Sequence, residues 1–142
     1  MSKKILAVDP GDKHIGIAIS DPTGTIANPY QVLTHVSRLI DAAEIARIAA
    51  DQGAVLIVVG QALDDEGEVG PAARKAQRLA DAIRSQTALP VELWDESSST
   101  QEAREVRLRM GVKREKRKGH LDDLAATVIL QSFLEAHHTN EK

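Results

Sequence analysis

The chain has 142 residues, contains no cysteine and carries a formal net charge of −3. This length favours one domain with a core of its own, and the lack of cysteine excludes disulfides and thiolate metal sites. No apolar run approaches membrane-spanning length, and residues 1–6 lead into a strand pattern without the apolar core of a signal peptide. We therefore expect a soluble, cytoplasmic protein that binds no membrane.

The first part of the chain predicts three strands. Residues 3–8 form a short apolar run, and residues 15–19 alternate isoleucine with small residues. The turn chemistry of residues 9–13 joins the two as a hairpin. A third strand is predicted within residues 25–33, where Pro29 indicates a break or a sheet edge.

Helical and strand patterns then alternate. Apolar residues at helical spacing predict a helix that ends at Gly53, and residues 54–59 are apolar without alternation, as in a parallel strand covered on both faces. The apolar positions of this helix are Val36, Leu39, Ile40, Ala43 and Ala46. The elements expected next are a loop at 60–70, a helix at 71–85, a strand at 91–94, and helices at 100–110 and 121–136.

This element order predicts an α/β fold. Strands that form hairpins first and alternate with helices afterwards indicate a mixed sheet, with antiparallel N-terminal strands, further parallel strands, and helices on both faces. That is the order of a ribonuclease H-like domain. We expect a single such domain over residues 1–136 and a polar, disordered tail at 137–142.

Three acidic residues are candidates for a functional site. Asp9 and Glu96 each follow a predicted strand, and ligands of open α/β sheets bind beyond the carboxyl ends of strands. Asp122 heads the apolar stripe of the last helix, where a carboxylate is costly unless it is paired or metal-bound. For Asp122 alone, stabilisation of the helix N-terminus is a competing interpretation. The stripe consists of Ala125, Ala126, Ile129 and Phe133.

Carboxylates are the ligands that hard divalent cations prefer, and we expect Mg²⁺ or Mn²⁺ here. Such ions can activate water and stabilise the leaving oxygen of a phosphodiester displacement. Asp9, Glu96 and Asp122 could therefore be both the metal ligands and the catalytic residues, although many globular domains could offer three such acids. No histidine metal site is predicted.

Positive charge is concentrated late in the chain. Eight of the 18 lysines and arginines lie within residues 104–118, a segregation that can attract a polyanion to one face. From charge alone, a solvated helix face followed by a flexible loop is the better interpretation. Because the chain has only three aromatic residues, we expect recognition of phosphates rather than base stacking. The candidate nucleic-acid-binding residues are Arg104, Arg107, Lys113, Arg114, Arg117 and Lys118.

Four segments with motif-like spacing follow one another over almost the whole chain. They are Val8-Asp9-Pro10-Gly11 with residues 15–18, Val58-Val59-Gly60 with Gly67, Asp95-Glu96 with Ser99-Thr100, and residues 118–122 with Ala125-Ala126 and Ile129-Leu130. Together and in register, these segments resemble the YqgF/RuvX family of pre-16S rRNA nucleases. The resemblance implies a ribonuclease H-like, metal-dependent nuclease that trims the 5′ end of pre-16S rRNA during ribosome maturation, with Asp9, Glu96 and Asp122 as its acids. Structured RNA and ribosomal particles would be its partners.

The chain departs from the family pattern at two places. Gln61 and Ala62 stand where Gly60 is usually followed by Leu-Pro, and Ser97 stands where an arginine is common. The missing arginine could weaken phosphate contact or charge stabilisation during the reaction. Two alternatives stay open: a Holliday junction resolvase acting on branched DNA, normally as a symmetric dimer, and a non-catalytic nucleic-acid or ribosome-associated factor. The sequence is compatible with a monomer or a homodimer.

Overall fold

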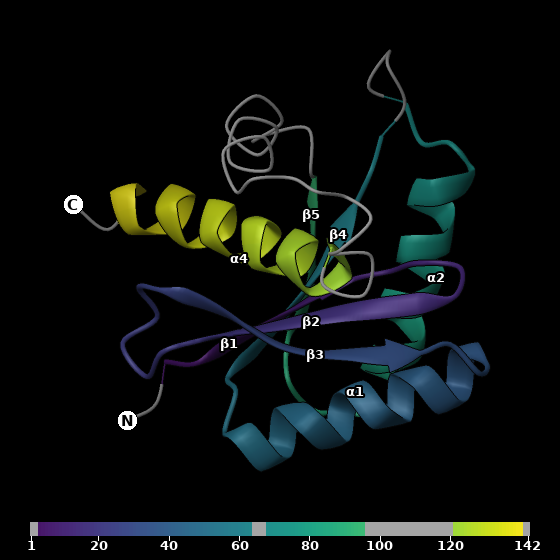
Figure 1. The fold of residues 1–142 in the computed structure, drawn as a ribbon, viewed down its shortest axis with the longest axis horizontal. Coiled ribbons are helices and arrows are strands. Elements are labelled where there is room, and N and C mark those ends of the chain that lie inside the picture. The colour runs from purple at the N-terminus through teal and green to yellow at the C-terminus, as the bar shows by residue number, and fades with distance from the viewer. Residues whose placement is uncertain (1–2, 64–67, 96–120, 141–142) are drawn as a thin grey trace.

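The computed structural model describes residues 3–63, 68–95 and 121–140, and in the last range the side chains of residues 124–137. These parts of the chain form a sheet flanked by helices (Figure 1). The strands are β1 (Ile5–Asp9), β2 (His14–Ser20), β3 (Ala27–Thr34), β4 (Leu56–Gln61) and β5 (Val91–Asp95). The helices are α1 (Arg38–Gln52), α2 (Pro71–Arg84) and α4 (Leu121–Asn140). The helix expected at residues 100–110 lies outside the described residues.

The strands form a five-stranded mixed sheet in the order β3-β2-β1-β4-β5. β2 pairs antiparallel with β1 and β3, whereas β4 pairs parallel with β1 and β5. Helix α4 crosses one face, and α1 and α2 cover the other (Figure 1). The predicted mixed α/β sheet with helices on both faces is confirmed.

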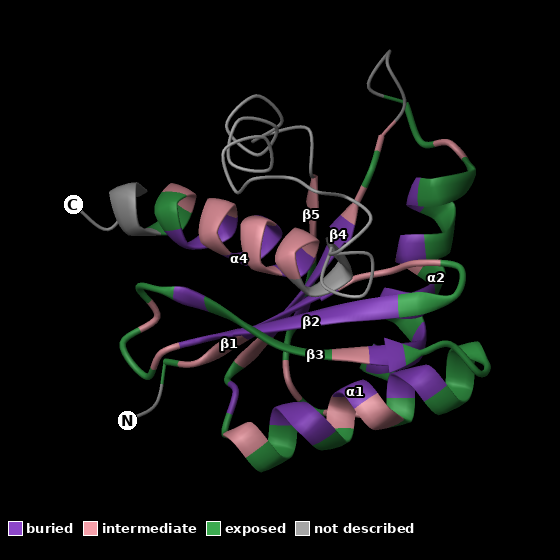
Figure 2. Ribbon diagram, viewed as in Figure 1, coloured by how far each residue is buried: buried purple, intermediate pink, exposed green. Residues whose placement is uncertain are grey.

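Alternation along β1 divides the core into two layers. Leu6 and Val8 belong to the apolar cluster under α1 and α2, whereas Ala7 belongs to the cluster under α4. Figure 2 shows buried residues along the central strands and on the helices that cover both faces of the sheet. Successive side chains of a strand point to opposite faces, so the side chain of Asp9 is on the same side as Ala7, toward α4.

The predicted parallel strand covered on both faces is confirmed in β4. Ile57 and Val59 pack in the α1/α2 layer, and Val58 packs in the α4 layer. All three are fully buried, which explains why the sequence shows no polar alternation there.

Pro29 lies in the edge strand β3, as the sequence predicted. Pro29 pairs with Ala18 while Gln31 pairs with Ile17, so the register shifts at this point and β3 has one extra residue. Proline has no N–H to donate to a ladder, and an edge strand with an irregularity accommodates it.

Helix α1 ends at Gly53, as the sequence predicted, and begins after Ser37. Ser37 is the N-cap and accepts a hydrogen bond from the Ile40 backbone N–H at 3.2 Å. Gly53 ends the helix with a φ of 69°, a left-handed conformation that glycine adopts without a Cβ penalty.

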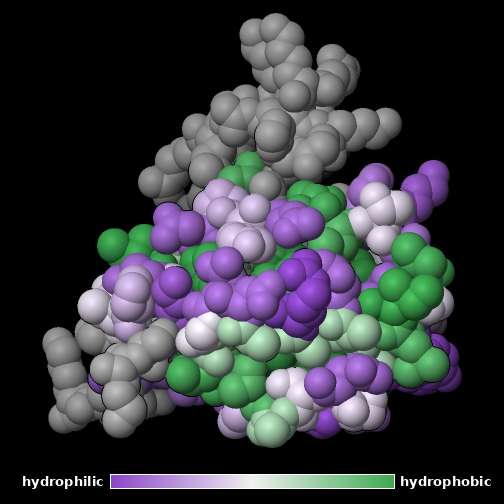
Figure 3. All heavy atoms as spheres, turned by 90° about the horizontal axis from the view of Figure 1, so that it is seen from below, coloured by the Kyte–Doolittle hydropathy of each residue, from purple (hydrophilic) through white to green (hydrophobic). Residues whose placement is uncertain are grey.

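The apolar residues whose spacing predicted α1 do not form its buried face. Val36, Leu39 and Ile40 are 63%, 65% and 55% exposed, and apolar surface gathers on this side of the molecule in Figure 3. Asp41 is buried instead, because its carboxylate accepts hydrogen bonds from the His35 ring and, at 3.0 Å, from the Val36 backbone N–H. The apolar residues that pack against the sheet are Ala42, Ile45, Ile48 and Ala49.

Helix α4 extends beyond the boundary expected at residue 136. Its backbone is helical to Asn140, and the ring of His137 stacks on Phe133 at a centroid distance of 3.8 Å. His137 also contacts Trp94 of β5, so aromatic contacts hold a residue that was assigned to the polar tail. In the expected stripe Ala126, Ile129 and Phe133 are buried, whereas Ala125 is half-buried. In the described part of the chain, no helix combines the length and apolar character needed to cross a membrane.

Candidate nuclease site

Asp9 is at the carboxyl end of β1, at the edge where the parallel strands of the sheet also end. β1 pairs with β4 up to Val8 and Val59, so Asp9 lies level with Gly60, and Gly60 pairs with Trp94 of β5. The side chain of Asp9 is half-buried and on the α4 side of the sheet. The sequence prediction that Asp9 lies at this edge is confirmed.

A tight turn after Asp9 depends on Gly11. A Cβ at this position would be 2.2 Å from the backbone carbonyl oxygen of His14. No side chain fits there without a shift of the backbone, so glycine sets the path that the chain takes from β1 into β2. The turn thereby determines where Asp9 is held.

A pocket of about 380 Å³ opens at this edge. Asp9 and Gly60 line it from the sheet, and the first turns of α2 line it on the opposite side. Its remaining lining residues are Pro10, Gly11, Asp12, Ala62, Pro71, Ala72, Lys75 and Ala76. The pocket thus combines two acidic residues, a lysine and closely approaching backbone at the position where α/β sheets bind ligands.

Lys75 is the cation of this pocket. It projects from α2 and forms an ion pair with Asp12 in the turn between β1 and β2. Both side chains remain exposed, at 57% and 81%, so the ammonium group is accessible to other anions. The sequence analysis did not identify Lys75, because a helical lysine is distinguished only by what the fold places opposite it.

The other two predicted acids are adjacent to described elements. Glu96 follows Asp95, the last residue of β5, and lies outside the described residues. Asp122 is in the first turn of α4, the helix on the same sheet face as the Asp9 side chain, and its own side chain lies outside the described residues. The assignment of Asp9, Glu96 and Asp122 as one catalytic, metal-binding triad therefore stays a prediction.

The donor chemistry at Asp9 suits a hard cation. Its carboxylate oxygens are the donors that Mg²⁺ and Mn²⁺ prefer. Within residues 3–63, 68–95 and 124–137, no cluster of three or more histidine, aspartate or glutamate side chains could hold a metal ion. The side chains of Glu96 and Asp122, the other two acids of the predicted triad, lie outside these ranges.

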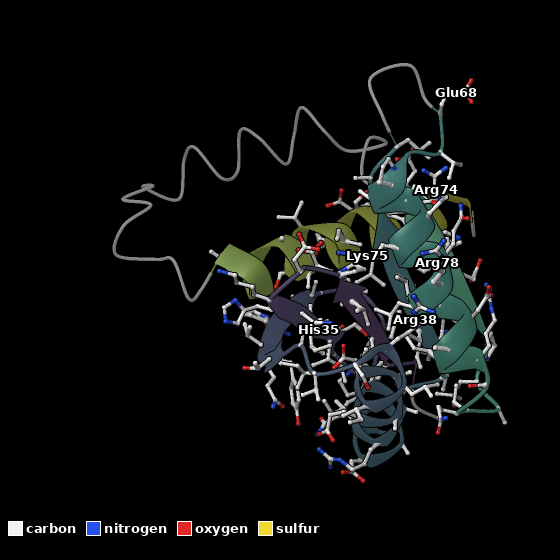
Figure 4. All side chains as sticks on the ribbon, turned by 90° about the vertical axis from the view of Figure 1, so that its right-hand side faces the viewer. His35, Arg38, Glu68, Arg74, Lys75 and Arg78 are labelled. Carbon is white, nitrogen blue, oxygen red and sulfur yellow. The ribbon has the colours of Figure 1, made fainter. Side chains whose placement is uncertain are left out.

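The predicted nucleic-acid-binding segment is not covered by the structure. Arg104, Arg107, Lys113, Arg114, Arg117 and Lys118 all lie outside the described residues. Among the described residues, basic side chains that sequence reasoning missed lie on the face that shows the carboxyl end of β1 (Figure 4). These are Arg38 at the start of α1 and Arg74, Lys75 and Arg78 on α2.

The mixed sheet, its strand order and the helices on both faces define a ribonuclease H-like domain. Solved structures share this fold over nearly their whole length. Thermus thermophilus RuvC in complex with a Holliday junction substrate aligns with a TM-score of 0.60 and 17% identity, covering 96% of each chain. A fowlpox virus Holliday junction resolvase aligns with a TM-score of 0.54 and 15% identity over 94% of this chain and 99% of its own.

Sequence comparison identifies the family. The model described as "RuvX: Holliday junction resolvase" matches residues 3–136. A relative from Chloroflexus aurantiacus, named "Putative pre-16S rRNA nuclease", is 38% identical over 96% of this chain and 89% of its own. A relative of the same name from Lachnospira eligens is 36% identical over 94% of this chain and 97% of its own. This chain belongs to the RuvX family.

Proposed function

We propose that this protein is a cytoplasmic nuclease that hydrolyses phosphodiester bonds of pre-16S rRNA during ribosome maturation. Membership of the RuvX family and the names of its relatives support the reaction and the substrate. The observation that carries the proposal is the position of Asp9, whose carboxylate ends a central strand beside a pocket at the ligand-binding edge of the sheet.

Asp9, Glu96 and Asp122 would hold Mg²⁺ or Mn²⁺. When bound, a divalent ion supplies an activated water and stabilises the charge on the leaving oxygen of a phosphodiester. The contribution of Asp9 is to hold a negative charge at a fixed place, because β1 is paired on both sides and Gly11 fixes the turn after it. Pre-organisation of this kind is what electrostatic catalysis requires.

Lys75 contributes a second charge to the same pocket. Its ammonium group lies on the α2 side, whereas the Asp9 side chain is on the α4 side. A phosphate bound at the pocket can therefore contact a cation from the protein on the side away from Asp9. Such a contact positions the substrate. The attacking group in this reaction is water, so no side chain has to act as the nucleophile.

A Holliday junction resolvase is the second candidate, favoured by the family description and by the shared fold with RuvC. The two are separated by offering the protein a labelled pre-16S RNA leader and a labelled four-way DNA junction together, with Mg²⁺ or Mn²⁺. Preferential cleavage of the RNA supports the proposal, and preferential cleavage of the junction supports the resolvase. If both are bound and neither is cut, the proposal is wrong and a non-catalytic factor takes its place.

A further inference from the structure

Two pockets meet at the turn between β1 and β2. The pocket that contains Asp9 shares three lining residues with a second pocket of about 230 Å³: Pro10, Gly11 and Lys75. The second pocket continues from this turn to the start of α1, where His35 and Arg38 line it. Lys75 therefore lies between the Asp9 pocket and a second hollow whose far side is formed by α1.

Several arginines near these pockets have no acidic partner among the described residues. Arg38, Arg74 and Arg78 form no ion pair among the described residues, and all three are exposed. The arginines further along the same helices are neutralised locally. Arg47 pairs with Glu44 and Asp51, and Arg84 pairs with Asp81.

Figure 4 shows the arrangement of this surface. Lys75 extends toward the turn after β1, and Arg38 and Arg78 come from α1 and α2, two helices that contact each other. Lys75 and Arg78 are three residues apart on α2, a spacing that places them on one face of the helix. Lys75 lines both pockets, Arg38 lines the second, and Arg78 follows Lys75 on α2.

Asp41, the acidic residue that lines the second pocket, already accepts hydrogen bonds from its neighbours. Asp41 is 4% exposed and its two carboxylate oxygens accept hydrogen bonds from His35 and from the Val36 backbone. Arg38 and Lys75, which also line this pocket, are exposed, whereas the Asp41 carboxylate is buried. An anion that approaches from solvent meets the cations first.

We propose that Arg38, Lys75 and Arg78 form a phosphate-binding surface that holds the nucleic-acid backbone next to the scissile bond. This inference rests on the proposed nuclease function for the position of that bond at Asp9. The nucleic-acid strand would run from the Asp9 pocket past Lys75 to Arg38 and Arg78. A phosphate takes the place of Asp12 as the partner of Lys75, so Asp12 competes with the substrate for this cation.

Binding measurements over a range of salt concentrations test the surface directly. All variants carry Asp9→Asn, so that the probe, a labelled pre-16S leader RNA, is bound without being cut. Each phosphate contact contributes to the slope of log K against log salt, and removal of one contact lowers that slope by about 1. We expect Arg38→Gln and Arg78→Gln each to lower the slope by about this amount and to weaken binding at low salt.

Matched controls come from the same helices. Arg47→Gln removes the same charge from α1 as Arg38→Gln, and Arg84→Gln removes the same charge from α2 as Arg78→Gln. We expect both controls to keep the parent slope, and Asp12→Asn to tighten binding because Lys75 loses its competitor. Equal slopes for test and control variants, or weaker binding by Asp12→Asn, would overturn the proposal. Thermal unfolding of each variant confirms that the compared proteins are folded.

The surface and the nuclease function fail in different ways. If the parent protein without Asp9→Asn cuts the RNA but Arg38→Gln and Arg78→Gln bind like the controls, the surface is wrong and the function stands. If the slopes fall as expected but the protein with Asp9 intact cuts no substrate, the function is wrong and the phosphate-binding surface stands.

Discussion

The ammonium group of Lys75 on α2 pairs with the carboxylate of Asp12 in the turn after β1, across 63 residues of sequence. The pair connects the helix that lines one wall of the Asp9 pocket to the turn that lines another. Both groups are well exposed, and an exposed ion pair contributes about 0–1 kcal/mol to stability. The pair is thus better suited to exchange partners than to hold the fold together.

The Asp12→Asn variant tests how much this pair stabilises the fold. We expect its free energy of unfolding to fall by less than about 1 kcal/mol, because water screens both charges. Urea denaturation of the variant and the parent protein at low and high salt measures the difference. A loss of several kcal/mol in the free energy of unfolding would show that the ion pair is important for the fold. Replacing Asp12 by a phosphate as the partner of Lys75 would then destabilise the protein.

Gly11→Ala is expected to disturb both the fold and the site. Its Cβ would meet the His14 carbonyl oxygen at 2.2 Å, and relief of such a clash costs about 1–3 kcal/mol. The shift of the turn should also displace Asp9 and lower cleavage at temperatures where the variant is folded. The control is Gly70→Ala, since a Cβ at Gly70 meets no atom within 4 Å. Equal stability and cleavage in the two variants would contradict the role given to the turn.

Asp21 gives the protein a defined response to acid. Hydrogen bonds from the backbone N–H groups of Ile26, at 2.9 Å, and Thr25, at 2.8 Å, and from the Thr23 hydroxyl hold the pKa of the Asp21 carboxyl well below its usual range. A lowered folded-state pKa stabilises the fold above the unfolded-state pKa of about 4 and loses that effect as pH falls through the lowered value. Asp21→Asn should therefore be less stable than the parent at pH 7.

Denaturation curves between neutral and acid pH measure this difference. The difference in free energy of unfolding between Asp21→Asn and the parent should stay constant down to about pH 4 and shrink below it. The reason is that the Asp21 carboxylate of the parent becomes protonated there and loses the charge that the variant never has. A gap of constant size into strong acid would mean that the carboxylate charge is not what stabilises the turn.

Metal binding should raise the melting temperature of the native protein. An ion that binds only the folded state stabilises it by about 2.7 kcal/mol at 100 times its dissociation constant. We expect titration with Mn²⁺ to raise the melting temperature of the parent and of Asp81→Asn, whose carboxylate pairs with Arg84 on the surface of α2. The same titration should leave Asp9→Asn unchanged. An unaltered response in Asp9→Asn would remove Asp9 from the metal site.

Much of the fold could be predicted because element type follows from local patterns. Turn chemistry placed the β1–β2 hairpin, the unbroken apolar run of residues 54–59 placed the central parallel strand, and Pro29 indicated an edge. In each case one local property of the chain decides the outcome. Asp9 could be placed at the sheet edge for the same reason, since a strand pattern ends there.

Properties that depend on packing partners could not be predicted. Leu39 and Ile40 have the helical spacing of a buried face, yet the sheet packs on the neighbouring face, which includes Asp41. That aspartate is acceptable inside because His35 and the Val36 backbone reach it. His137 belongs to α4 for a similar reason, because Trp94, from a distant strand, contacts it.

The site was predicted in part. Sequence reasoning found Asp9, but it did not find the cations of α1 and α2 beside it. Arg38 and Lys75 are far apart in the chain and come to the same pocket only through the packing of the two helices. Charge concentration identified residues 104–118 because it registers cations that are close in sequence, not those that the fold brings together.

Cleavage of a labelled pre-16S RNA leader by the parent protein and by Asp9→Asn, with Mg²⁺ or Mn²⁺ present, tests the central claim most directly. Asp81→Asn serves as the matched loss of an exposed carboxylate, and Glu96→Gln and Asp122→Asn extend the test to the other two predicted acids. We expect the parent and Asp81→Asn to cut the RNA and the three other variants to bind it without cutting. Cleavage by Asp9→Asn at the parent rate would contradict the assignment of the site to the carboxyl end of β1.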